Sequence, residues 1–281
     1  MKKSTCFSSR FNRIRLYLGV LAMGLFELFG ASTSQAGPAM GPAEKYFDPQ
    51  PAALVRAALA NDATRVRELV STGVDPNSQG PRSNSKNTPQ ITLLGYAVGQ
   101  RSEGALRLLI EAGANPLFEP RDDDGNVFIF TIVRKDSAML DALYRAWPMA
   151  KVPAKTQSRI AFSALGFDCT ACLHVMFQHG MPVGVQDGRG FNLFLAAMTR
   201  EDFETAEWLL KDMAIPLDAE TRRGVNSANY LQEDLIRYRP GTPTHDQLLR
   251  LQAVMQARGV IFPVPTIEQR QLDLGIKRHQ P

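Results

Sequence analysis

The sequence predicts an all-α fold built from about six stacked helix–turn–helix repeats. Apolar residues recur at helical spacing in a series of short runs, and several runs end in glycine. These terminal glycines are Gly73, Gly113, Gly180 and Gly259. Trp147 and Met213 stand at the same place in two further runs, so successive ends lie 40, 34, 33, 33 and 46 residues apart. A period near 33 residues indicates a solenoid in which each repeat packs only against its neighbours.

A loop motif leads into the first helix of several repeats. The segment DGRGFNLFLAA, residues 187–197, is similar to the pattern Asp-x-x-Gly-x-Thr-Pro-Leu-x-x-Ala, with Asn192 in the threonine place. Residues 122–130 and 221–228 are weaker copies, and in TLLGYAV the threonine is Thr92. Threonine or asparagine caps free amides at a helix start, and glycine after the second helix accepts a left-handed C-cap.

On these motifs, residues 51–265 resemble the ankyrin-repeat family. The resemblance implies an all-α ankyrin solenoid of about six repeats with β-hairpin-like loops. Two departures are visible: Trp147 and Met213 replace the C-cap glycine, and an intact Thr-Pro-Leu-His motif is missing. Distorted turns are expected at those two repeats, and a generic solenoid of helical pairs remains the alternative.

Residues 1–36 are typical of an export signal. The basic segment MKKSTCFSSRFNRIR precedes the apolar run LYLGVLAMGLFELFGA, and the small residues Ser34 and Ala36 follow. The apolar run has 16 residues and contains Glu27, whereas a membrane-spanning helix needs about 20 apolar residues. The sequence therefore predicts cleavage after Ala36 and a periplasmic mature protein without a membrane segment. An uncleaved anchor helix is the alternative.

Outside this segment, the sequence predicts a short linker at 37–50 and a C-terminal tail at 266–281. The chain has 32 basic and 28 acidic residues, a formal net charge of +4. The first 36 residues hold five basic residues and one acidic residue, which leaves 27 of each in the remainder. A balanced mature chain does not favour nucleic-acid binding, which needs a basic surface.

The resemblance implies that a protein partner binds the loop tips and the inner face of the first helices. By position, the tips are residues 78–90, 119–126, 185–191 and 219–225. The candidate residues on these surfaces are Arg82, Lys86, Tyr96, Arg121, Asp122, Asp123, Asp124, Asp187, Arg189, Phe191, Arg222 and Arg223. Each charge alone is also typical of a solvated loop, but together they form a surface of mixed sign that can discriminate between partners.

No metal site and no cofactor are expected. The run Asp122–Asp124 lacks the alternating ligands and the terminal glutamate of a calcium loop. His174 and His179 lie five residues apart and do not share a helix face, which argues against zinc.

Cys169 and Cys172 form a Cys-x-x-Cys pair at the start of an expected second helix. In an oxidising compartment a local disulfide is the common outcome. Buried free thiols and a redox motif are the alternatives, because a helix N-terminus stabilises a thiolate. The surrounding sequence lacks a thioredoxin-like strand and helix.

The resemblance implies a non-catalytic protein-binding module that is a monomer when free. Some exported ankyrin proteins resemble immunity partners of antibacterial effectors, including lipases delivered by type VI secretion. The leading hypothesis is therefore a periplasmic immunity protein, whose partner is a secreted effector. Two alternatives stay open: a periplasmic scaffold that protects against oxidative stress beside an enzyme such as catalase, and a thiol–disulfide protein that uses Cys169 and Cys172.

Overall fold

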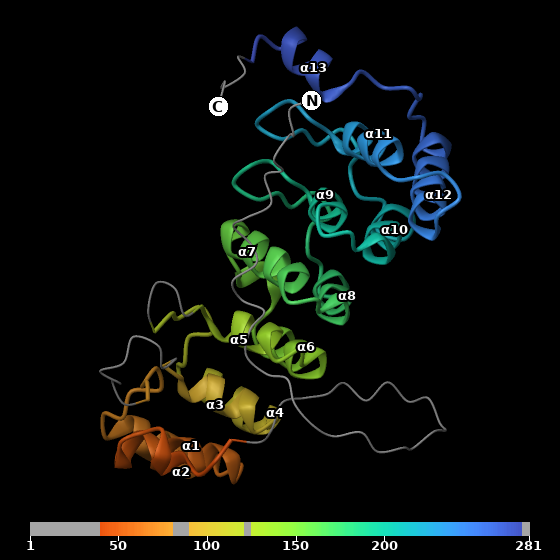
Figure 1. The fold of residues 1–281 in the computed structure, drawn as a ribbon. Helices are drawn as coiled ribbons and strands as arrows, with labels where there is room; N and C mark the ends of the chain where they lie inside the picture. Colours follow the sequence, from red (N-terminus) through yellow and green to blue (C-terminus); the bar gives the residue numbers. More distant parts are fainter. Residues whose placement is uncertain (1–39, 81–89, 121–124, 277–281) are drawn as a thin grey trace, which may run out of the picture. The chain divides into compact units, whose positions relative to one another are not determined.

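A computed structural model of the chain describes residues 40–80, 90–120 and 125–276. These residues form helices joined by loops, and twelve of the helices make six consecutive pairs (Figure 1). The pairs are α1 (Pro49–Leu59) with α2 (Ala63–Ser71), α3 (Leu93–Gly99) with α4 (Glu103–Glu111), α5 (Val127–Val133) with α6 (Ser137–Ala146), α7 (Ala154–Gly166) with α8 (Thr170–Gln178), α9 (Leu193–Met198) with α10 (Phe203–Lys211), and α11 (Ser227–Arg237) with α12 (Pro243–Ala257). A further helix, α13 (Ile267–Asp273), follows the last pair. The predicted all-α array of about six repeats is confirmed.

The pairs stack so that their helices form two rows (Figure 1). Along the row of first helices, each helix from α1 to α9 contacts the next one, and among the second helices α4 contacts α6 and α6 contacts α8. Between α8 and α10 side chains make the contact, since the His174 ring stacks on Trp208 with centroids 3.9 Å apart. Each repeat therefore buries its apolar face against its neighbours.

The core runs through all the repeats. In the second repeat, Leu94 is 3% exposed, and Leu106 and Leu109 are fully buried. Small residues in the first helices, such as Ala97 and Ala197, are also fully buried, which lets neighbouring helices approach closely. Because these side chains face adjacent repeats, no single pair of helices could bury them alone.

The helix ends follow the expected chemistry. Thr92 and Asn192 accept hydrogen bonds from the amides of Gly95 and Leu195 at the starts of α3 and α9. Isolated antiparallel bridges, Gln79 with Thr92 and Gln186 with Asn192, give two of the loops their hairpin character. The four predicted C-cap glycines are all left-handed: Gly73 at φ 96°, Gly113 at 103°, Gly180 at 86° and Gly259 at 91°.

The turns differ where glycine is missing. Trp147, at φ −134°, ends α6, and a 3₁₀ turn, η2 (Met149–Lys151), leads directly into α7, which at 13 residues is longer than the other described first helices. In the repeat that has Met213 in the glycine place, the next residue, Ala214, adopts the left-handed conformation instead, at φ 48°. The connection between α6 and α7 therefore differs from the one between α8 and α9, which carries the bridge of Gln186 with Asn192.

The segment before α1 packs on the array, although the sequence predicted a linker up to residue 50. Residues Ala43–Lys45 form the 3₁₀ turn η1, and Ala43 and Phe47 are buried. The Tyr96 hydroxyl of α3 donates to the Gly41 carbonyl at 2.6 Å, and Gln100 Nε2 donates to the Met40 carbonyl at 2.9 Å. These residues therefore cover part of α3. The predicted signal segment, 1–36, lies outside the described residues.

The segment after α12 also packs on the array, although the sequence predicted a tail from residue 266. Gln232 of α11 exchanges two hydrogen bonds of 2.7 Å with the backbone of Val264. From α13, Arg270 donates to the Gly224 carbonyl and pairs with Glu220. Within the part of the chain that the structure describes, no helix is long and apolar enough to cross a membrane.

Candidate functional site

Two loops of the same form precede α9 and α11. They are residues 187–191 and 221–225, and they lie 34 positions apart. In the first loop, Asp187 Oδ1 accepts hydrogen bonds from the amides of Arg189 at 2.8 Å and Phe191 at 3.0 Å. In the second, Thr221 Oγ1 accepts from the amides of Arg223 at 3.3 Å and Val225 at 3.2 Å. In both, one polar side chain closes the loop from within and leaves arginine at the exposed tip.

The hydrogen bonds and the ion pair within the first loop favour the charged form of the Asp187 carboxyl. Burial alone raises the pKa of this carboxyl, but the amides of Phe191 and Arg189 and the Arg189 guanidinium outweigh it and hold the pKa below its usual value. The guanidinium lies 2.9 Å from Asp187 Oδ2 and also covers the Phe191 ring, 4.7 Å from its centroid. Arg189 is thereby held in one orientation across the loop.

The two loops touch each other through their backbones. The Arg222 amide donates to the Arg189 carbonyl at 2.9 Å. Gly190, at φ 86°, allows this approach, because a Cβ atom there would lie 2.7 Å from the Glu220 carbonyl oxygen and 2.9 Å from Thr221 Cα. The arginines of the two tips are therefore placed on one surface by a backbone contact.

A pocket of about 560 Å³ opens beside these loops. Its wall carries three arginines, Arg189, Arg222 and Arg223, and its aromatic surface comes from Phe191 and Tyr230. The two rings meet edge to face with centroids 5.8 Å apart. Side chains of α13 complete the wall. Within the described residues, neither Arg222 nor Arg223 has an ion-pair partner, and both are exposed.

A second pocket, of about 240 Å³, adjoins the first and shares Tyr230 and Glu233 with it. Its other charged groups are Glu201, Asp234 and Arg237. Asp234 pairs with Arg237 at 2.9 Å, and burial raises the pKa of the Asp234 carboxyl. We call the two adjoining pockets the α11 groove, since Tyr230, Glu233 and Asp234 of α11 line it.

Tyr238 closes the acidic end of the α11 groove. Its hydroxyl donates to Glu201 Oε1 at 2.7 Å. Burial and this hydrogen bond to a carboxylate raise the pKa of Tyr238 to about 12. Tyr238 therefore stays neutral at physiological pH.

The structure gathers four of the predicted binding residues in the α11 groove: Arg189, Phe191, Arg222 and Arg223. Asp187 lies beneath them as the acceptor that orders the first loop. The prediction that Tyr96 contacts a partner is wrong. Tyr96 is 2% exposed, because Tyr46 and Phe47 pack on its ring at centroid distances of 5.7 and 5.6 Å, so it is not available to a partner. The remaining predicted binding residues lie outside the described residues: Arg82, Lys86, Arg121, Asp122, Asp123 and Asp124.

Tyr230 and Glu233 were missed by the sequence prediction. Tyr230 follows the cap residue Asn226 by four positions, as Tyr96 follows Thr92. The register that selected Tyr96 therefore also points to Tyr230, whose ring is only partly buried. A comparison of equivalent positions across repeats would have found it.

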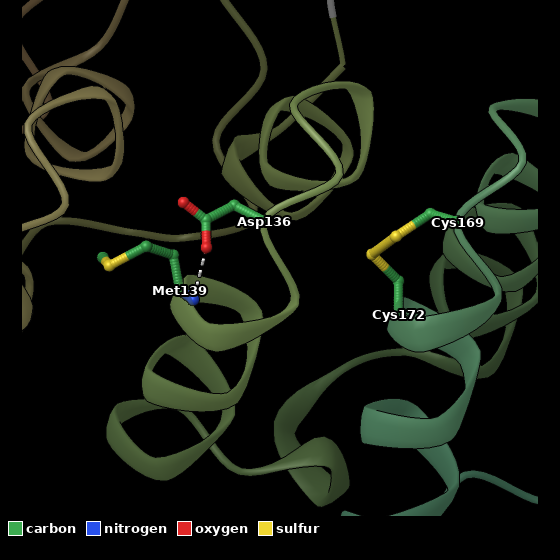
Figure 2. The surroundings of a disulfide bond; sticks show 4 residues. All are labelled: Asp136, Met139, Cys169 and Cys172. Atoms are coloured by element: carbon green, nitrogen blue, oxygen red, sulfur yellow. Dashed lines mark hydrogen bonds between the residues drawn. A yellow bond between two sulfur atoms is a disulfide. The ribbon is translucent and has the colours of Figure 1, made fainter. Parts of the chain in front are cut away.

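A disulfide joins Cys169 and Cys172 at the start of α8, with an S–S distance of 2.07 Å (Figure 2). In the preceding repeat, 33 residues earlier, Asp136 and Met139 occupy the same positions, and Asp136 Oδ1 accepts the Met139 amide at 3.2 Å. Cys169 is the N-cap of α8, and its side chain makes no capping hydrogen bond. The disulfide thus stands where the other second helices have a side-chain cap.

Burial keeps other thiols from reaching the sulfur atoms of this disulfide. Cys169 is 4% exposed and Cys172 is fully buried. Exchange requires a thiolate to reach one of the two sulfurs, and neither is accessible in the folded array. The pair therefore has the character of a structural cross-link.

We expect the disulfide to stabilise the array as a covalent cap. Replacing both cysteines by alanine should lower the unfolding free energy by about 2 kcal/mol, from loop closure over a very short loop. The variant Cys169→Asp/Cys172→Ala should recover about 1 kcal/mol of that loss, because aspartate can cap α8. Urea titrations of the three proteins measure both values. An aspartate variant no more stable than the alanine variant would show that the capping interpretation is wrong.

Metal-binding groups do not gather in the described residues. No group of three or more histidine, cysteine or acidic side chains there is arranged to hold an ion. His174 stacks on Trp208, whereas His179 Nε2 lies 2.8 Å from Asp141 Oδ1 of α6. The two histidines thus take part in separate contacts between neighbouring repeats.

No protein-family model matches the chain, and no curated protein does. Among solved structures, it is similar to the ankyrin repeat domain of Bcl-3, a member of the IkappaB protein family. That match has a TM-score of 0.57 and 16% identity and covers 79% of this chain and 96% of the other. A second structure, the ankyrin repeat protein EF0377, gives a TM-score of 0.49 and 12% identity over 72% of this chain and 97% of its own. Together with the six helix pairs, the Bcl-3 match assigns this chain the ankyrin-repeat fold.

Proposed function

We propose that this chain is a non-catalytic protein-binding module whose partner docks on the α11 groove. Stacked repeats offer extended surfaces of this kind for binding. The groove supports the proposal because it combines aromatic surface with exposed arginines, and arginine and aromatic side chains dominate the energetics of protein interfaces. The observation that carries the proposal is the state of Arg222 and Arg223. Both are exposed in the first pocket, and neither forms an ion pair within the described residues, so both can contact a bound protein.

We further propose that the module is exported and acts in the periplasm as an immunity protein. The order of basic segment, apolar run and small residues at 1–36 supports export. The partner would be a secreted antibacterial effector, such as a lipase delivered by type VI secretion. The loop tips would enter the mouth of the effector's active site and block its substrate.

A survival assay tests this proposal. If a secreted effector candidate is encoded beside this chain, bacteria that export it should survive only when the full chain is co-expressed. Removal of residues 1–36 should abolish protection while the purified protein keeps its helical signal. Survival without the chain, or equal protection by the version lacking residues 1–36, would contradict the exported immunity role. A neighbouring gene for an enzyme such as catalase, with no toxicity, would favour the scaffold instead.

A further inference from the structure

The first pocket of the α11 groove carries more arginine than acidic side chains, with Glu233 at its border with the second pocket. Arg189 is held by Asp187 at 2.9 Å, but Arg222 and Arg223 have no such partner within the described residues. The nearby Glu220 forms an ion pair with Arg270 of α13. Two guanidinium groups therefore face the first pocket with their charge available, and guanidinium binds carboxylate with paired hydrogen bonds.

The other end of the groove is negative. Glu201 and Glu233 line the second pocket, and in the part of the chain described here neither has an ion-pair partner. Asp234 is neutralised by Arg237 at 2.9 Å. Glu201 accepts a hydrogen bond from the Tyr238 hydroxyl at 2.7 Å, a group that brings no positive charge. The second pocket is therefore suited to a lysine or arginine side chain.

Tyr230 joins the two ends. It lines both pockets, and its ring packs on Phe191 in the first. A chain that lies along α11 would thus cross an aromatic surface between its two charged contacts. Charged groups arranged in this way fix the direction in which a partner binds.

We propose that the α11 groove binds one extended segment of the partner protein that carries both an acidic and a basic side chain. The acidic side chain lies between Arg222 and Arg223, and the basic side chain lies between Glu201 and Glu233. This inference rests on the proposed function, and it adds the chemistry of the bound segment. A nucleic acid or an anionic membrane fits less well, because the acidic end would repel its phosphates.

Short labelled peptides test the groove without a known partner. One peptide carries Asp-Glu before Lys-Arg, with a short Gly-Ser spacer, a second carries the reverse order, and a third carries only the acidic pair. The protein is the chain without residues 1–36, so that the version used is the predicted mature form. Backbone and arginine side-chain NMR shifts detect weak binding and place it on the chain.

We expect one of the two mixed peptides to shift the resonances of Arg223, Tyr230 and Glu233 and to bind about tenfold more tightly than the other two peptides. The variant Arg222→Glu/Arg223→Glu should abolish these shifts. The control Arg67→Glu/Arg239→Glu, which changes the net charge equally but lies outside both pockets, should leave them unchanged.

Equal binding of both mixed peptides, tightest binding of the purely acidic peptide, or no shifts at all would overturn the proposed segment. The survival assay separates this inference from the proposed function. Protection that persists in Arg222→Glu/Arg223→Glu would leave the immunity role standing and exclude the groove. Peptide binding without any protection would exclude the immunity role and leave the groove standing.

Discussion

Leu109→Asp should unfold the array well beyond its own repeat. Leu109 is fully buried in α4, which packs against α1, α3 and α6. Loss of a buried leucine side chain costs about 2–5 kcal/mol, and a buried unpaired carboxylate adds several more. The sum approaches the total stability of about 5–15 kcal/mol for a typical domain. Because stability in stacked repeats comes largely from the interfaces, the first and third repeats should lose structure too.

Circular dichroism during heating measures this effect. Arg107→Asp is the matched control, since Arg107 lies two residues away in the same helix and its side chain is 62% exposed. The control should melt within a few degrees of the unmutated protein. A Leu109→Asp variant that melts with the unmutated protein would mean that α4 presents a different face to its neighbours.

Gly190→Ala should separate the two loops that form the positive end of the α11 groove. An alanine in the left-handed region costs about 1–2 kcal/mol. The new methyl group would also lie 2.7 Å from the backbone oxygen of Glu220, so one of the loops must move. We expect the unfolding free energy to fall by about 3 kcal/mol when this overlap is included.

Gly188→Ala is the control for this change. Gly188 belongs to the same loop, yet a Cβ atom there meets nothing within 4 Å, so its cost should stay within about 0.5 kcal/mol. Hydrogen exchange at the Arg222 amide reports the contact with the Arg189 carbonyl directly. It should accelerate in Gly190→Ala and stay slow in Gly188→Ala. Equal effects of the two substitutions would mean that the loops do not depend on their close approach.

The repeated elements could be predicted because their chemistry is local. Glycine closes the second helices at Gly73, Gly113, Gly180 and Gly259, and Thr92 and Asn192 cap the first helices. Each of these roles depends on a residue and its neighbours within one turn. A period near 33 then places the helix pairs in register without knowledge of any distant contact.

The rest depends on contacts between distant segments. Tyr96 has the same register as Tyr230, but Tyr46 and Phe47 cover it, and a sequence pattern does not reveal that cover. Likewise, α13 lies within a segment predicted as a tail, although Arg270 fastens it to Gly224. The approach of the two loops at Gly190 also became visible only in three dimensions.

The groove was predicted in part. Arg189, Phe191, Arg222 and Arg223 were selected because loop tips in such arrays are exposed. The acidic end was missed because Glu201 belongs to the turn after α9, whereas Glu233 lies in α11, 32 residues later. Only the packing of α9 against α11 brings the two carboxylates to one pocket.

Photo-crosslinking in living cells tests the central claim that a protein partner docks on the α11 groove. A photoreactive phenylalanine derivative is placed at position 271 of α13, which lines the first pocket, or at position 256, an exposed site on α12 in the second-helix row. We predict one discrete protein adduct at position 271, lost on adding Arg222→Glu/Arg223→Glu, and none at position 256. An adduct at position 256 alone, or none at position 271, would contradict the account.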